Sequence, residues 1–195
     1  MSIHRRRSIS LKGYDYSEPG AYFVTICTQD RVCLLGEVVD GEVRLSDAGR
    51  VVQAAWNELS NRYPGVEIDA FMVMPNHIHG IILLVESVPG VGAGLRACPD
   101  PDQTSKRIGQ PQGVAPTRLS LSDVMHRFKT MTTKRYADGV NGRGWQPFHG
   151  RLWQRNYYEH VIRNDSELDK IRKYITTNPL KWALDRENPQ RGALR

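Results

Sequence analysis

The alternation of apolar and polar positions predicts several short strands along the chain. β-Branched and aromatic residues dominate residues 20–29, which is typical of a strand. Residues 37–45 hold Asp40-Gly41 between valines, a dipeptide that favours a hairpin turn. Residues 66–74 and 77–86 also read as strands, and Pro75-Asn76 breaks the pattern between them. Because this connection is so short, the last two strands are expected to be antiparallel neighbours.

Helices are predicted where the apolar spacing changes to three and four residues. One such stripe covers residues 48–63, with Ser46 as its N-cap. A second stripe, at residues 119–131, carries basic residues on its other side. A third helix begins after Asn164 and ends at Asn178, which precedes a proline.

The remaining segments are less regular. Residues 87–116 are rich in glycine, proline and polar residues, and we expect a flexible insert there. Residues 138–150 are punctuated by glycine and read as a loop, whereas the aromatic-rich residues 152–162 are expected to be extended. The polar tail from residue 180 onward either docks on the protein or frays.

This order of elements is strand, hairpin, helix, strand, strand, helix, strand, helix. An α+β fold satisfies it, with a ferredoxin-like antiparallel sheet and helices packed on that sheet. Residues 1–195 are expected to form a single domain, because the length supports one core and is marginal for two.

Charge and composition narrow the classes of partner and compartment. The formal net charge is +6 and the sequence pI is about 9.4. A positive excess favours polyanionic partners without establishing one. The chain has no apolar run long enough to span a membrane, and its three cysteines lack metal-type spacing. No signal peptide is expected, because no apolar segment follows the basic residues near position 5. A cytoplasmic location is expected, with nucleoid association when DNA is bound.

The strongest local motif is Pro75-Asn76-His77-Ile78-His79-Gly80, at the start of a predicted strand. Side chains two apart on a strand share a face, so His77 and His79 project together. Two adjacent imidazoles provide half of a metal site. The alternative is a pair of polar residues on a solvated sheet face. The position between a Pro-Asn break and an apolar run favours the functional interpretation.

The last predicted helix supplies a reactive group and a further ligand. Tyr174 and Asn178 are four residues apart, so they lie on one helical face. The Asn178 amide oxygen could join the two imidazoles, and the Tyr174 phenol could reach a phosphate at the metal. The alternative is that Tyr174 is a packing residue and Asn178 a helix C-cap.

Together, the motifs PNHIHG, FKT, LWQRNYYEHVIR and IRKYITTNP resemble those of the single-tyrosine HUH transposases, especially the REP-associated tyrosine transposases. The resemblance runs from about residue 22 to about residue 182. It implies the HUH endonuclease fold, Mg²⁺ or Mn²⁺ held by His77, His79 and Asn178, and Tyr174 as the nucleophile. Tyr157 and Tyr158 are rival nucleophiles, but adjacent strand residues face opposite ways, and Tyr174 is favoured.

The resemblance implies a metal-dependent endonuclease and strand transferase acting on single-stranded or hairpin DNA through a covalent 5′-phosphotyrosine intermediate. The expected DNA contacts are basic and aromatic residues: Arg127, Lys129, Lys134, Arg135, Arg155, Tyr157 and Tyr158, with Trp145 and Trp153 as further stacking candidates. For the four basic residues of the second predicted helix, the alternative is a solvated helix face.

Two other function classes remain open at this point: a non-catalytic module that binds hairpin DNA or RNA, and a metal-dependent hydrolase of a small substrate. The sequence also leaves open whether the protein acts as a monomer or a homodimer.

Overall fold

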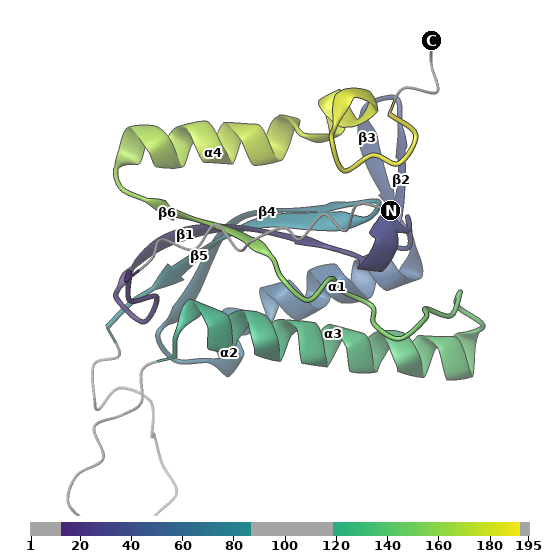
Figure 1. The fold of residues 1–195 in the computed structure, drawn as a ribbon, viewed down its shortest axis with the longest axis horizontal. Helices are drawn as coiled ribbons and strands as arrows, with labels where there is room; N and C mark the ends of the chain where they lie inside the picture. The colour runs from purple at the N-terminus through teal and green to yellow at the C-terminus, as the bar shows by residue number, and fades with distance from the viewer. Residues whose placement is uncertain (1–12, 87–118, 192–195) are drawn as a thin grey trace, which may run out of the picture.

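A computed structural model describes residues 13–86 and 119–191, and its centre is a four-stranded antiparallel sheet (Figure 1). The strand order is β4-β5-β1-β6. The strands are β1 (Gly20–Cys27), β4 (Val66–Met74), β5 (His77–Leu84) and β6 (Tyr158–Ile162). One helical segment separates β1 from β4 and another separates β5 from β6, which is the ferredoxin-like arrangement. The predicted α+β fold class is confirmed.

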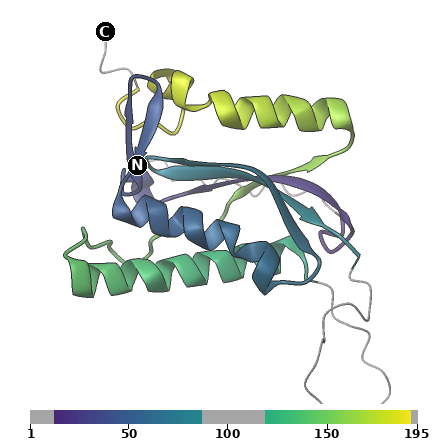
Figure 2. The ribbon, with the colours of Figure 1, turned by 180° about the vertical axis from the view of Figure 1, so that it is seen from behind.

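Helices cover both faces of this sheet (Figures 1 and 2). On one face lie α1 (Asp47–Asn57), α2 (Leu59–Arg62) and α3 (Leu121–Arg143), and on the other lies α4 (Asp165–Thr177). Ser46 caps α1 by accepting a hydrogen bond from the Gly49 N–H, and Asn164 caps α4 by accepting one from Glu167. Both caps agree with the sequence prediction.

The face under α1 and α3 holds the larger core. Trp56 of α1 is completely buried, stacks on Phe71 of β4, and meets Phe128 of α3 edge-on. A Cβ atom at Gly80 would lie 2.3 Å from the Trp56 ring, so the glycine after His79 lets α1 approach the sheet. The final residue of the PNHIHG motif therefore serves packing on the face opposite the histidines.

A separate two-stranded hairpin, β2 (Gly36–Val39) and β3 (Glu42–Leu45), stands at one end of the sheet. Its turn residues Asp40 and Gly41 both have positive φ, as the Asp-Gly dipeptide predicted. A short 3₁₀ helix (Gln29–Arg31) follows β1, and a second one (Pro179–Leu184) follows α4 beside the hairpin.

Two predicted boundaries were wrong. Helix α3 continues to Arg143, where a loop was predicted from residue 138, because Gly139 lies against the Trp145 ring and the helix ends only at left-handed Gly144. Of the predicted extended segment, only Tyr158–Ile162 pairs as a strand, and Trp153 forms an isolated bridge with Thr28.

The predicted flexible insert at 87–116 lies outside the described residues. Within the described ranges, no helix has both the length and the apolar character needed to cross a bilayer.

Candidate active site

Strand β5 places His77 and His79 side by side on the face covered by α4. Their neighbour Ile78 belongs to the core on the opposite face, as the alternation of a strand requires. His77 has no exposed surface and His79 is only 3% exposed. The alternative of two polar residues on a solvated sheet face is therefore wrong.

The outer ring nitrogens of both histidines have hydrogen-bond partners. His77 Nδ1 lies 2.9 Å from Asn76 Oδ1, and His79 Nδ1 lies 2.8 Å from Thr25 Oγ1. The Asn76 amide nitrogen donates to two backbone carbonyls, which fixes the amide orientation and leaves its oxygen to accept from His77 Nδ1–H. The neutral His77 ring therefore carries its lone pair on Nε2.

The inner nitrogens converge: His77 Nε2 and His79 Nε2 are 3.0 Å apart. Two adjacent nitrogen ligands of an octahedral ion, each about 2.1 Å from it, lie about 3.0 Å apart. The Thr25 hydroxyl can donate to His79 Nδ1 when the two rings share a hydrogen bond, or accept from Nδ1–H when Nε2 binds a cation. The pair therefore fits a divalent metal without rearrangement of the strand.

Both imidazoles are held in the neutral form that metal ligation requires. Burial lowers the pKa of His77 to about 4, although the nearby carboxylates of Asp185 and Glu187 oppose this shift. Burial and the neighbouring His77 also hold the pKa of His79 well below its usual value.

Helix α4 brings Tyr174 to the same place. Its phenolic oxygen lies 3.5 Å from His79 Nε2, and the residue is 43% exposed. Partial burial is the main reason that the pKa of Tyr174 is raised, so the phenol needs a nearby positive charge to ionise. Arg172, two residues earlier, holds the helix on the sheet with 3.0 Å and 2.6 Å hydrogen bonds to the Asp69 carboxylate. Asp69 sits where an irregularity in the register of β4 turns it toward α4.

Asn178 ends α4 beside this group and is 2% exposed. Its Nδ2 lies 3.3 Å from an Asp185 carboxylate oxygen, while its Oδ1 is buried with no hydrogen-bond partner among the described residues. A buried acceptor without a partner is costly unless something else binds it. The Asn178 amide oxygen is therefore available as a ligand, although the residue also lies at the end of α4.

The sequence analysis missed Asp185. One of its carboxylate oxygens lies within 4.8 Å of a ring nitrogen of each of the two histidines, and the three residues form a group that could hold a metal. Asp185 follows the second 3₁₀ helix, in the polar tail for which docking and fraying were both open. The tail has no hydrophobic periodicity, so its sequence contains no signal for this position. Residues 185–187 in fact dock against β1 and the turn that precedes β5.

The predicted DNA contacts on α3 lie across the sheet from the histidines (Figure 1). All four have partners within the protein. Lys129 donates to two backbone carbonyls, and burial lowers its pKa to about 8. Arg135 forms a two-point pair with Glu58, and Arg127 lies over the Tyr63 ring. Lys134 is exposed and pairs with Asp138 one turn later at 3.4 Å. The structure therefore gives Lys129 and Arg135 structural partners and separates all four residues from the candidate site.

The remaining predicted contacts divide by position. Tyr158 is 40% exposed, and its ring meets Phe23, which also stacks on His79 and contacts Tyr174. Arg155 is exposed on the segment that leads into β6. Tyr157 is instead partly buried against Lys129. Trp153 is buried in the core, so the prediction that it stacks on bases was wrong.

Comparisons with known proteins place this arrangement in a family. The family model described as IS200-like transposase matches residues 114–178, which include Tyr174 and Asn178. An uncharacterized protein of Haemophilus influenzae is 37% identical over 190 residues, covering 94% of this chain and 93% of that protein. A second protein of that organism, named "Putative REP-associated tyrosine transposase", is 26% identical over 167 residues, or 86% of this chain and 74% of its own length.

A solved structure of a REP-associated tyrosine transposase bound to a REP hairpin aligns with a TM-score of 0.49 at 21% identity, over 93% of this chain and 74% of that one. From the family match and the sequence relatives, the chain belongs to the IS200-like transposases and is related to the REP-associated tyrosine transposases.

Proposed function

We propose that this protein is a divalent-metal-dependent endonuclease and strand transferase for single-stranded DNA, with Tyr174 as its nucleophile. The observation that carries the proposal is the convergence, within one chain, of the Tyr174 phenol with two buried, inward-facing imidazole nitrogens. The membership in a transposase family supports DNA as the substrate.

The chain offers a mixed nitrogen and oxygen donor set for Mg²⁺ or Mn²⁺. His77 and His79 would supply Nε2, and oxygen would come from the Asp185 carboxylate and from Asn178 Oδ1, the buried acceptor without a partner in the described part of the chain. Imidazole and carboxylate ligands suit Mn²⁺, and oxygen ligands suit Mg²⁺. A bound ion would polarise the scissile phosphate and favour the ionised form of the nearby phenol.

Tyr174 would attack the scissile phosphorus in line with the leaving 3′-oxygen. The bond between phosphorus and that oxygen breaks as the tyrosine–phosphorus bond forms, leaving a 5′-phosphotyrosine and a 3′-hydroxyl. The phenolic proton passes to water at the exposed side of the ring, and the leaving oxygen takes a proton from water. A 3′-hydroxyl of a second DNA end can then attack the phosphotyrosine and release Tyr174, so joining needs no nucleotide cofactor.

The exposed position of Tyr174 favours a flexible, single-stranded segment at the cleaved phosphate. Phe23 and Tyr158 continue an aromatic path from Tyr174 along the sheet, and such rings can stack on unpaired bases. Arg155 is exposed on the segment that leads into β6, and we assign it to the DNA bound beyond this path. Arg127, Lys129, Lys134 and Arg135 receive no contact at the scissile phosphate. The name of the REP-associated relative supports a hairpin-forming repeat as the natural target.

The decisive experiment is a search for a covalent adduct. Full-length protein is incubated with single-stranded hairpin oligonucleotides from repeats of the source genome and with Mn²⁺, and the products are separated on a denaturing gel. The wild type should form an adduct, and Tyr174→Phe should form none while still binding the hairpin. Tyr157→Phe and Tyr158→Phe are matched controls that should retain the adduct. An adduct formed by Tyr174→Phe would overturn the assignment, and hairpin binding by an inert wild type would indicate a binding module.

A further inference from the structure

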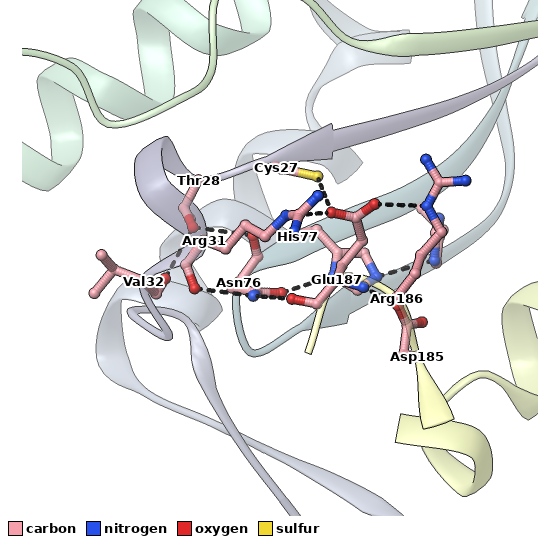
Figure 3. Close-up of polar contacts among 10 residues, drawn as sticks. Cys27, Thr28, Arg31, Val32, Asn76, His77, Asp185, Arg186 and Glu187 are labelled. Atoms are coloured by element: carbon pink, nitrogen blue, oxygen red, sulfur yellow. Dashed lines mark hydrogen bonds and ion pairs between the residues drawn. The ribbon is translucent and has the colours of Figure 1, made fainter. Parts of the chain in front are cut away.

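A closed set of hydrogen bonds joins the histidine strand to the docked residues 185–187 (Figure 3). Asn76 is completely buried and occupies the centre of this set. Its Oδ1 lies 2.9 Å from His77 Nδ1, and its Nδ2 donates to the Glu187 carbonyl at 2.7 Å and to the Arg31 carbonyl at 2.9 Å. One side chain therefore contacts a candidate metal ligand and also the segment that carries Asp185.

Glu187 completes the connection to Asp185. Its backbone N–H donates to Asp185 Oδ1 at 2.7 Å, so the carbonyl held by Asn76 and the N–H held by Asp185 belong to one residue. Its carboxylate is 8% exposed and accepts from Arg31 Nε at 2.7 Å and from Arg186 Nε at 3.1 Å. The Cys27 thiol also donates to it, at 3.6 Å. Figure 3 shows these groups converging on the carboxylate from β1, from the turn that follows it, and from the C-terminal segment.

We propose that Asn76 and Glu187 are positioning residues for the metal site, which together fix Asp185 relative to His77. The inference rests on the proposed function, because it assumes that His77 and Asp185 bind the same ion. It goes further by assigning a role to two residues that do not themselves face that ion. We name this pair, with its anchor Arg31, the C-terminal bracket.

The physical need for the bracket follows from the chain's topology. Asn76 and Glu187 are 111 residues apart in sequence, and Asp185 lies beyond the last long helix. A ligand on such a segment would lose much conformational freedom on binding the metal, unless the segment is already fixed. The Asn76 oxygen also orients the His77 ring, as outer partners of metal-bound histidines commonly do, and loss of such partners typically costs ~10–100-fold in metal affinity.

The test measures Mn²⁺ binding directly, on the full chain without DNA, from the electron paramagnetic resonance signal of free Mn²⁺. We expect Asn76→Ala to raise the Mn²⁺ dissociation constant by ~10–100-fold. Glu187→Gln and Arg31→Gln are smaller side-chain changes and should fold, and each should raise the constant by about 3- to 10-fold. Arg186→Gln is the matched control, since it removes a cation from the same carboxylate but from an exposed position, and its constant should stay within about twofold of the wild type.

A second readout separates positioning from a purely structural role. At saturating Mn²⁺, the rate of adduct formation by Glu187→Gln should return to near that of the wild type, because the defect lies in metal affinity. If folded Glu187→Gln and Arg31→Gln bind Mn²⁺ as tightly as the wild type, the positioning role of the C-terminal bracket is wrong, even if Asn76→Ala fails to fold. Absence of Mn²⁺ binding by the wild type would instead overturn the proposed metal site.

Discussion

The two faces of the central sheet differ in how many apolar side chains they bury and in whether they carry candidate site residues. Among the described residues, the face under α1 and α3 gathers 21 buried apolar side chains into one cluster, whereas the face under α4 gathers four. The smaller face carries the two buried histidines and the exposed nucleophile candidate. The extensive apolar packing on one face therefore supports polar, partly solvated chemistry on the other.

Strand β5 shows this division within consecutive residues. His77 and His79 face α4, while Ile78 and Gly80 face α1. A single-residue shift in register would bury the isoleucine under α4 and turn both imidazoles into the apolar core. The packing of Trp56 against Gly80 opposes such a shift, so the core fixes the direction of the site residues.

The largest expected effects come from changing neighbours on this strand. His77→Ala should reduce adduct formation by ~10³-fold or more, because metal stabilisation of the phosphate is lost, while hairpin binding remains. Ile78→Ala should instead lower the free energy of unfolding by about 2–5 kcal/mol, because it leaves a cavity in the main core. Adduct gels and urea unfolding measure the two variants. Comparable loss of stability in both would contradict the division between the faces.

The next effect is a pH dependence confined to the histidine face. The pKa of His77 is about 4 in the folded protein, below its unfolded value of about 6.5, so the unfolded chain binds protons first as pH falls. The stability that this group contributes is therefore fully present above pH ~6.5 and is lost progressively as pH falls toward ~4. Urea unfolding in EDTA between pH 7 and 4.5 checks this. The double variant His77→Gln, His79→Gln should show a much shallower slope over the same window.

A smaller effect is expected from the ion pair that holds α4. Arg172→Ala removes both hydrogen bonds to Asp69 and should slow adduct formation by about 10-fold, because Tyr174 is no longer held in line with the phosphate. Mn²⁺ affinity should change little. Arg62→Ala, which removes a pair with Glu58 on the other face, is the matched control and should leave the rate unchanged. Equal rates for Arg172→Ala and the wild type would show that the small core under α4 is enough to hold Tyr174 in position without the ion pair.

The smallest effect concerns the contribution of two exposed cations, Arg155 and Lys134, to DNA affinity. Arg155→Ala should weaken hairpin binding about threefold and lower the salt dependence of binding by about one ion. Lys134→Ala, on the far side, should change affinity by less than about 1.5-fold. Fluorescence anisotropy titrations at several salt concentrations measure both. A larger effect of Lys134→Ala would instead support α3 as a DNA-binding surface.

The sequence by itself determined the features that depend on local spacing. Alternation in 77–84 placed two histidines on one face, the Asp40-Gly41 dipeptide set the hairpin, and Ser46 and Asn164 capped their helices. The order of elements was sufficient for the fold class. These predictions succeeded because each rests on steric or hydrogen-bonding preferences within a few residues. The predicted end of α3 was wrong because its glycines were interpreted as a loop, whereas Gly139 lies within the helix and packs closely against Trp145.

Only the tertiary structure decided which distant residues meet. Asp185 and Glu187 lie in a polar tail without periodicity, yet hydrogen bonds to Asn76 and an ion pair with Arg31 bring them to the histidines. The same holds for α3, because only the fold shows that its basic stripe lies across the sheet from the histidines and that Arg135 pairs with Glu58. Contacts between segments more than a hundred residues apart depend on how the whole chain packs, and local sequence preferences carry no information about them.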